Sequence, residues 1–173
     1  MSVPLAWRLP PRWVLLVALV LILCAEVGGA SMVRFKLEVT RWARGVMLAR
    51  PEVHGLVGVR DVDERILDEA LVKVDAGLRL FHMHAEGMGL VILATTTVAA
   101  TVAGAGRGLM IVLLTVGGAG YPLGYLLWSG LIPYYGVEPG KAVAEWVWVP
   151  FGGATIVALW WLSALVAVRM VRR

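Results

Sequence analysis

The residues of this sequence with the clearest chemical potential lie together in one short stretch. His82 and His84 are two of the three histidines in the chain, and Glu86 and Met88 follow them at alternate positions. Imidazole nitrogens are common metal ligands, and carboxylate or thioether groups can complete a ligand set. The stretch therefore predicts either a ligand site or a polar seam between helices.

Helical geometry decides which of these groups can act together. Successive residues of an α-helix turn by about 100°, so His82 and His84 point about 160° apart. His82 shares a face with Glu86, whereas His84 shares a different face with Met88. A metal site at His82 and Glu86, or a cofactor site using His82, His84 and Met88, therefore needs donors from other segments.

Three interpretations of this stretch remain open. The histidines could bind haem b or a single Fe or Cu ion. They could also be interfacial groups bonded to water or to glutamate. A proton relay through His82, Glu86 and Glu26 is the third, because Glu26 lies in an apolar run where an ionisable side chain is costly. Glu26 is equally suited to pair with Arg34, and methionines such as Met88 more often pack than bind.

The composition of the chain is that of a membrane protein. The 173 residues are 60% hydrophobic and 16% charged, with a mean hydropathy of +0.80, whereas soluble domains carry about 25% charged residues. Eight tryptophans fit a bilayer, because indole rings favour its interfaces. The net charge of +4 is better explained by topology than by nucleic acid. A single cysteine, Cys24, excludes an intrachain disulfide and a cysteine metal motif.

Four apolar segments approach the length of about 20 residues that a membrane-spanning helix needs. We expect spans at 13–32, 87–103, 109–130 and 151–168. The predicted fold is an all-α integral membrane protein, a four-helix bundle forming one domain over residues 1–173. The first run also resembles a signal peptide, since the small residues Gly28-Gly29-Ala30 lie near its end, but its length favours a retained span.

The long polar segment, residues 33–86, lies between the first two predicted spans. From Asp61 onward it has the acidic first turn and the apolar periodicity of an amphipathic helix. The apolar positions recur at steps of four and three: Leu67, Leu71, Val74, Leu78 and Phe81. We expect this helix to pack against another helix and to continue into the second span.

Further donors and packing signals follow in the second half of the chain. Tyr121 and Tyr125 lie in the third span, and Glu145 lies near the fourth, within an aromatic-rich connection over 131–150. Gly120 and Gly124 form a small-xxx-small pair suited to close helix contact.

The distribution of basic residues predicts the orientation in the membrane. If both termini are cytoplasmic, the inner side holds six cations and no acid: Arg8, Arg12, Arg107, Arg169, Arg172 and Arg173. This bias favours a multi-pass protein of the cell (inner) membrane with both termini inside. Segments 33–86 and 131–150 would then lie outside.

The segment His82-Met83-His84-Ala85-Glu86-Gly87 resembles the His-x-x-x-Glu-Gly segment of a transmembrane helix in nitric oxide reductases, of the haem–copper oxidase superfamily. The resemblance implies that His82 and Glu86 bind a non-haem iron beside a haem. The chain departs from that family after this segment. No histidine follows His84, and residues 120–125 read Gly-Tyr-Pro-Leu-Gly-Tyr where a His-His pair would be expected. A complete reductase site in one chain is therefore excluded by ligand count.

Together these features predict a small haem- or metal-binding membrane protein. It would act in electron transfer, sensing or small-molecule redox chemistry at the outer face. So few histidines indicate a homo-oligomer or an open coordination position. The alternative is a non-catalytic subunit or assembly factor of a larger membrane complex, docked through the apolar stripe and the Gly120/Gly124 surface. The sequence indicates no substrate and no reaction.

Overall fold

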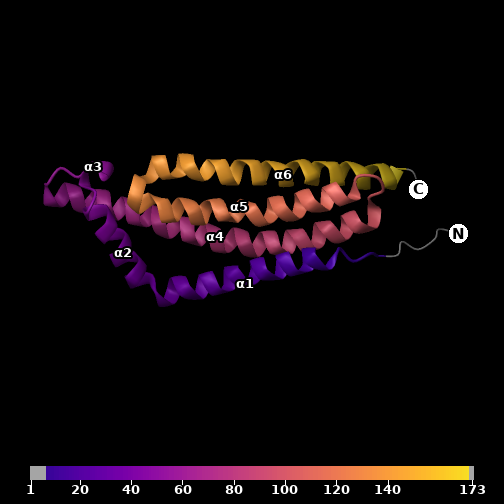
Figure 1. Ribbon diagram of the computed structural model, residues 1–173, viewed down its shortest axis with the longest axis horizontal. Helices are drawn as coiled ribbons and strands as arrows, with labels where there is room; N and C mark the ends of the chain where they lie inside the picture. The colour runs from indigo at the N-terminus through magenta and orange to yellow at the C-terminus, as the bar shows by residue number, and fades with distance from the viewer. Residues whose placement is uncertain (1–6, 172–173) are drawn as a thin grey trace.

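The computed structural model describes residues 7–171, which are helical almost throughout (Figure 1). The helices are α1 (Arg12–Arg34), α2 (Lys36–Leu48), α3 (Pro51–His54), α4 (Arg60–Val102), α5 (Arg107–Tyr135) and α6 (Val137–Val171). Four of them, α1, α4, α5 and α6, are long and apolar enough to cross a membrane. The predicted all-α fold with four membrane-spanning helices is therefore confirmed. Arg172 and Arg173, which we counted among the inner cations, lie outside the described residues.

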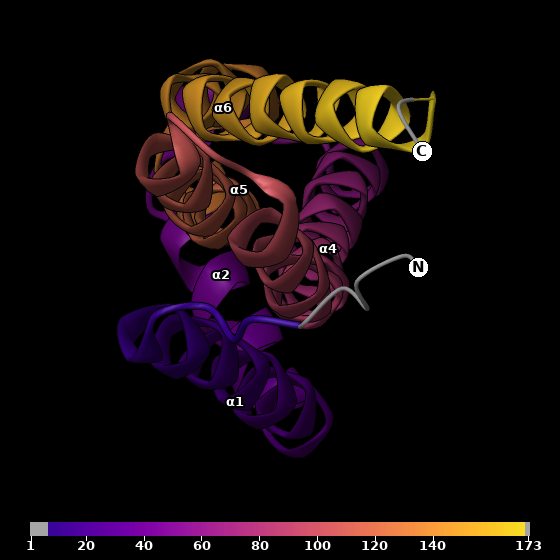
Figure 2. The same ribbon diagram turned by 90° about the vertical axis from the view of Figure 1, so that its right-hand side faces the viewer.

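The four long helices form an elongated bundle in which consecutive spans run in opposite directions (Figure 1). Seen along the bundle, α4 and α5 occupy the middle, with α1 on one side and α6 on the other (Figure 2). α1 packs mainly on α4 and α6 mainly on α5, while α4 and α6 contact each other sparsely. Helices α4 and α5 therefore each meet a different neighbour on either side, α4 between α1 and α5 and α5 between α4 and α6.

Helix α4 is continuous over 43 residues, as the sequence predicted. At 1.5 Å per residue it is about 64 Å long, roughly twice the hydrocarbon thickness of a bilayer. Its first half therefore projects beyond the membrane. The predicted stripe packs inward, with Leu67, Val74 and Phe81 each no more than 8% exposed.

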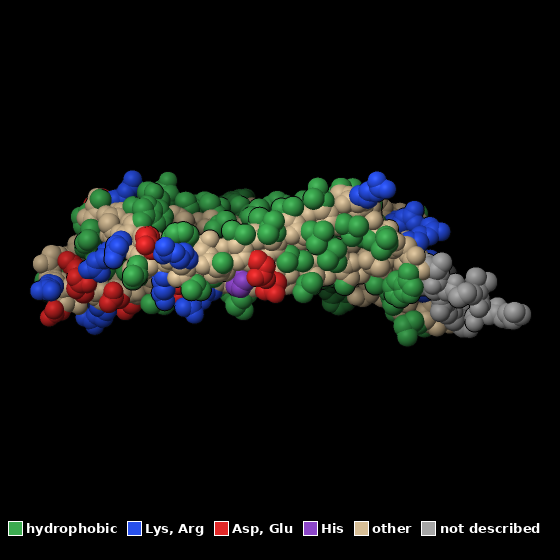
Figure 3. Space-filling view, turned by 90° about the horizontal axis from the view of Figure 1, so that it is seen from below, with side chains coloured by type: hydrophobic (Ala, Val, Ile, Leu, Met, Phe, Trp, Pro, Cys, Tyr) green, Lys and Arg blue, Asp and Glu red, His purple; other side chains and the backbone are tan. Residues whose placement is uncertain are grey.

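The projecting part of α4 belongs to a small unit that we call the polar cap: α2, α3, residues 60–80 of α4 and the turn between α5 and α6. Its core joins Met47 of α2, Leu67 and Val74 of α4, and Ile132 of α5. Two backbone N–H groups before α4, at residues 57 and 58, donate to the Asp63 carboxylate at 2.8 and 2.9 Å. In Figure 3, side chains of both charges gather over this cap, and hydrophobic side chains cover the middle of the bundle.

The segment 131–150, which we predicted as a connection, is helical on both sides of a tight turn. α5 continues to Tyr135 and α6 begins at Val137, so both helices extend beyond the predicted spans. Gly136 makes the turn with φ of 84°, a left-handed conformation that favours glycine. Pro139 lies in the first turn of α6, where a missing N–H breaks no helical bond.

Glycines let α5 approach α6 closely. A Cβ atom added at Gly120 would lie 2.4 Å from the Phe151 ring, and one at Gly124 would lie 2.7 Å from the Trp148 side chain. The small-xxx-small pair therefore packs within this chain. We had expected the Gly120/Gly124 surface to dock a larger membrane complex. Because α6 covers this surface within the chain, it is not free to dock a separate protein.

Candidate functional site

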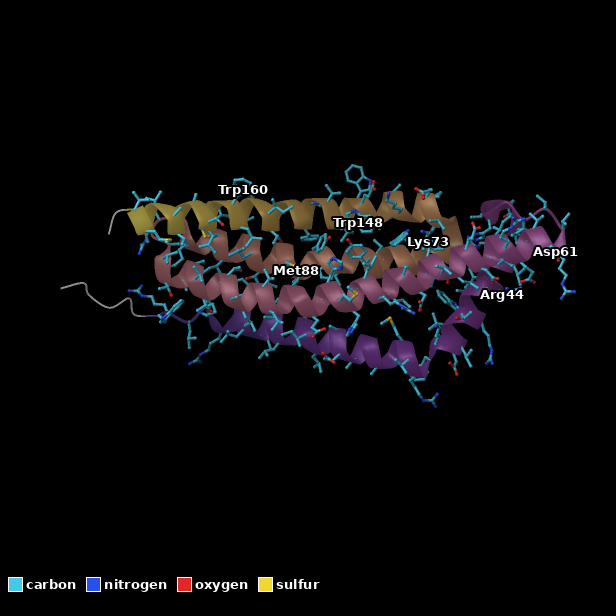
Figure 4. The ribbon with its side chains drawn as sticks, turned by 180° about the vertical axis from the view of Figure 1, so that it is seen from behind. Arg44, Asp61, Lys73, Met88, Trp148 and Trp160 are labelled. Carbon is cyan, nitrogen blue, oxygen red and sulfur yellow. The ribbon has the colours of Figure 1, made fainter. Side chains whose placement is uncertain are left out.

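The histidines of α4 lie at the end of the bundle's apolar part that adjoins the polar cap. His84 precedes Val102, the last residue of α4, by 18 residues, or about 27 Å along the axis. Tyr125 lies the same number of residues beyond Arg107 on α5. Since the hydrocarbon core is about 30 Å thick, these side chains lie near its cap-side edge. Figure 4 labels the neighbouring Met88 on α4 and Trp148 on α6.

His82 lies on the side of α4 that faces α1. Its Nδ1 atom is 2.8 Å from the carbonyl oxygen of Ala25. Because a carbonyl can only accept, Nδ1 carries the proton and donates it, which leaves the Nε2 lone pair free. The ring also lies against Gly29, where an added Cβ would be 2.8 Å from the ring's Cε1 atom. His82 is thus a half-buried contact between α4 and α1.

The two glutamates predicted to act with His82 lie on the same side of the bundle. Glu26 follows Ala25 on α1 and is exposed, while Glu86 shares the His82 face of α4 and is partly exposed. Figure 3 shows acidic side chains beside a histidine where the apolar band begins. Among the described residues neither Glu26 nor Glu86 forms an ion pair, so the pairing of Glu26 with Arg34 that the sequence allowed is not seen.

The donor set around His82 is incomplete, within one chain, for the non-haem iron that the nitric oxide reductase resemblance implies. Within residues 7–171, no group of three or more His, Cys, Asp or Glu side chains lies close enough to hold a metal ion. A non-haem iron centre of the facial type uses two histidines and a carboxylate. His82 and Glu86 supply two ligands at most, because His84 lies on another face of α4.

His84 lies toward α5. Its Nδ1 atom is 2.8 Å from the carbonyl oxygen of Leu80, one turn earlier in α4, so Nε2 is again free. The imidazole stacks on the Tyr125 ring, with centroids 4.7 Å apart and planes at 25°. It also meets the Tyr121 ring edge-on at 5.3 Å. The two tyrosine hydroxyls are 2.9 Å apart and share a hydrogen bond.

The aromatic contacts continue to α6. The Tyr125 and Trp148 rings lie 5.1 Å apart, and Trp148 meets Trp128 at 6.3 Å. We call His84, Tyr121, Tyr125 and Trp148 the His84 cluster. Its side chains connect α4, α5 and α6 in one layer, and aromatic pairs of this kind contribute about 0.5–1.5 kcal/mol each.

Sequence reasoning placed the two tyrosines at this level but did not pair them with His84, and it did not single out Trp148. The signal was present in part. Tyr121 and Tyr125 are four residues apart, which puts both rings on one face of α5. Which helix this face of α5 meets depends on where α4 and α6 pack, and no local sequence pattern predicts that packing.

The remaining candidates lie elsewhere or serve packing. Met88 packs on α5, its methyl group 3.1 Å from a Cβ added at Gly118. Glu145 is 3.9 Å from Lys141, its neighbour in the first part of α6. His54 lies in the polar cap, with Nε2 3.0 Å from the carbonyl oxygen of Pro133. These residues therefore do not join the histidines of α4 in one site.

Comparison of the chain with protein-family models, with curated proteins and with solved structures finds no match. The short nitric oxide reductase resemblance thus stays a prediction. The function is inferred below from the geometry of the two histidines.

Proposed function

We propose that this chain is a small membrane protein that binds haem or a single metal ion and acts in electron transfer or small-molecule redox chemistry. One observation carries the proposal. His82 and His84 both lie 2.8 Å from a backbone carbonyl through Nδ1. In metal-binding histidines a bond of this kind fixes the tautomer and orients the free nitrogen toward the metal.

The packing limits where such a group can bind. The interior between α4 and α5 has no room for a flat macrocycle, since even a Cβ at Gly118 would come within 2.9 Å of Ile92. The cofactor would therefore be held from the surface of the bundle, with His82 as principal ligand and Glu86 in support. A second copy of the chain would supply another axial ligand. A bound haem or metal ion would provide one-electron chemistry.

The ends of the bundle support an inferred orientation. The backbone N–H of Arg8 donates to the Thr101 hydroxyl at 3.0 Å, which places the N-terminal segment beside the turn that carries Arg107. Arg169 lies at the same end, in the last turn of α6. We infer that this basic end faces the cytoplasm and that the polar cap faces outward.

Absorption spectroscopy and metal analysis of the purified full chain test the proposal. Expressed with adequate haem supply, the native chain should show a Soret band or about one Fe or Cu per chain, and His82→Ala should lose it. His54→Ala is the matched control, because His54 lies in the polar cap and should leave the cofactor content unchanged. A native chain with neither a Soret band nor stoichiometric metal contradicts the proposal.

A second candidate function is that of a subunit or assembly factor in a larger membrane complex. One observation favours it: the cap part of α4 exposes a mixed-charge face made of Asp61, Arg65, Asp68, Glu69 and Lys73. Figure 4 labels Asp61 and Lys73 on this part of α4. The apolar stripe of α4 is covered within the chain, so docking would use the charged face. A stable partner recovered from native membranes, without any cofactor, would support this function over the first.

A further inference from the structure

An open groove between α4 and α6 runs along the half of the bundle that lies away from the polar cap. It has a volume of about 420 Å³ and is lined chiefly by Ala94, Thr95, Val98, Leu159, Val166 and Met170. It exists because α4 and α6 both pack on α5 and contact each other sparsely. The Thr95 hydroxyl donates to the Val91 carbonyl at 2.7 Å, so it is not left unpaired in the groove wall. The groove is therefore mainly apolar.

The groove has the length and depth of one leaflet of a bilayer. Met170 follows Leu159 by 11 residues of α6, or about 16 Å, which is about half of the 30 Å hydrocarbon core. Trp148 packs on Tyr125, near the cap-side edge of that core. Arg169 follows Trp148 by 21 residues, or about 32 Å, and so lies at the opposite edge. An acyl chain in the groove would therefore have its headgroup at the depth of Arg169.

An exposed arginine lies where each wall of the groove ends. On α6, Arg169 is in the last turn of the helix, directly before Met170. On the α4 side, the backbone N–H of Arg8 donates to the Thr101 hydroxyl at 3.0 Å. Thr101 is three residues beyond Val98, so Arg8 is held about one helical turn past the lined part of α4.

These two cations have no acidic partner among the described residues. Neither arginine takes part in the ion pairs of that part of the chain. The segments that reach this end of the bundle contain no Asp or Glu over residues 7–25, 87–137 and 146–171. Figure 3 shows basic side chains without acidic ones at this end. A positive end beside an apolar groove complements a ligand with a negative headgroup and an apolar chain.

We propose that this groove binds an anionic phospholipid, with an acyl chain between α4 and α6 and the phosphate at Arg169 and Arg8. A guanidinium can donate two parallel hydrogen bonds to a phosphate. A zwitterionic phospholipid has similar chains, but its own cation lowers the net attraction to the two arginines. The site involves neither His82 nor His84 and does not depend on a bound haem or metal.

Photolabelling of the purified full chain in dodecyl maltoside micelles tests the site. The label is a phosphatidylglycerol with a diazirine in one acyl chain. The competitors are unlabelled phosphatidylglycerol and phosphatidylcholine with identical chains. Labelled peptides should map to residues 94–102 and 159–171. Phosphatidylglycerol should displace the label about tenfold better than phosphatidylcholine, because each of two cations favours the anionic headgroup.

Single charge removals test the headgroup contact. Arg169→Gln and Arg8→Gln should each reduce the preference for phosphatidylglycerol by about threefold to fivefold. Arg12→Gln is the matched control, because it removes the same charge at the same end of the bundle. Arg12 begins α1, on the other side of α4 from α6 (Figure 2), so this variant should retain the native preference. All three side chains are exposed, and circular dichroism checks that each variant is folded.

Four results would overturn the proposal. Equal displacement by the two phospholipids would show a groove that accepts any acyl chain. A preference that is unchanged in both groove variants, or lowered as much by Arg12→Gln, would remove the two arginines from the site. Displacement by inorganic phosphate as effective as that by phosphatidylglycerol would show a site for a free anion. Labelling that maps to α1 or to the polar cap would place the lipid elsewhere.

Discussion

The two sides of α4 present the same chemical group in different surroundings. His82 and His84 lie two residues apart, and each donates Nδ1–H to a backbone carbonyl at 2.8 Å. On one side the imidazole meets the backbone of α1 at Ala25 and Gly29, whereas on the other it stacks on the Tyr125 ring of α5. The comparison shows that the neighbouring helix, and not the histidine itself, determines what each imidazole contacts.

The contrast extends to how the helices are held. α1 meets α4 through close contacts at glycines, since a Cβ atom added at Gly89 would lie 2.4 Å from Ile22, and through the hydrogen bond from His82, which contributes about 1 kcal/mol net. The α4–α5–α6 side combines glycine-mediated contact with a layer of aromatic pairs. We therefore expect α1 to be the more easily displaced helix, and the predictions below test that difference.

The largest effect is expected where α5 meets α6. Gly120→Ala adds a Cβ atom 2.4 Å from the Phe151 ring, and we expect it to destabilise the chain by about 1–3 kcal/mol through overpacking. The matched control is Gly130→Ala on the same helix, where nothing lies within 4 Å of the added atom. The control should be neutral or stabilising by up to about 1 kcal/mol, because alanine favours helix. Denaturant unfolding in detergent measures both, and equal effects would contradict the packing described here.

A smaller effect is expected at the contact between α1 and His82. Gly29→Ala places a Cβ atom 2.8 Å from the His82 ring and should destabilise the chain by about 1 kcal/mol. In the background of His82→Ala the same change should be nearly neutral, since the clash is gone. A double-mutant cycle measures this coupling. Strictly additive effects would mean that the ring does not lie on Gly29.

Removing each imidazole should affect different helices. His82→Ala should increase amide hydrogen exchange in α1 by about tenfold or less, because one hydrogen bond of about 1 kcal/mol is lost. His84→Ala should leave exchange in α1 at its native rate and change it near Tyr125 instead. Amide hydrogen exchange, measured by mass spectrometry in both variants, tests this prediction. Faster exchange of α1 in His84→Ala would break the distinction between the two sides.

The smallest expected effect comes from one hydroxyl group. Tyr121→Phe removes the hydrogen bond to Tyr125 and should lower stability by less than about 1 kcal/mol. The imidazole ¹⁵N signals should report it selectively, with the His84 signals shifting and those of His82 staying in place. Both histidines of the native chain should show the Nδ1–H tautomer. A native His84 with the proton on Nε2 would contradict the hydrogen bond to Leu80.

Much of the fold followed from local patterns. The steps of four and three from Leu67 to Phe81 predicted a helix that runs into the second span, and α4 is continuous from Arg60 to Val102. The segment 131–150 was less predictable. Pro133, Gly136 and Pro139 are all compatible with a long break, yet only Gly136 leaves the helical conformation. Pro139 lies in the first turn of α6, where a proline disrupts nothing, and Pro133 is accommodated in the last turn of α5. These residues therefore do not by themselves set the length of a connection.

For the candidate site, the sequence by itself determined that the two imidazoles of α4 must diverge. Helical geometry is local, and a step of two residues turns a side chain by about 200° whatever surrounds it. Only the tertiary structure decided that His82 meets α1 and that His84 joins the tyrosines of α5 and Trp148 of α6. Those partners are far apart in the chain. The glycines bring the helices together only where the side chains of the facing helix fit against them. No pattern within one segment contains that information.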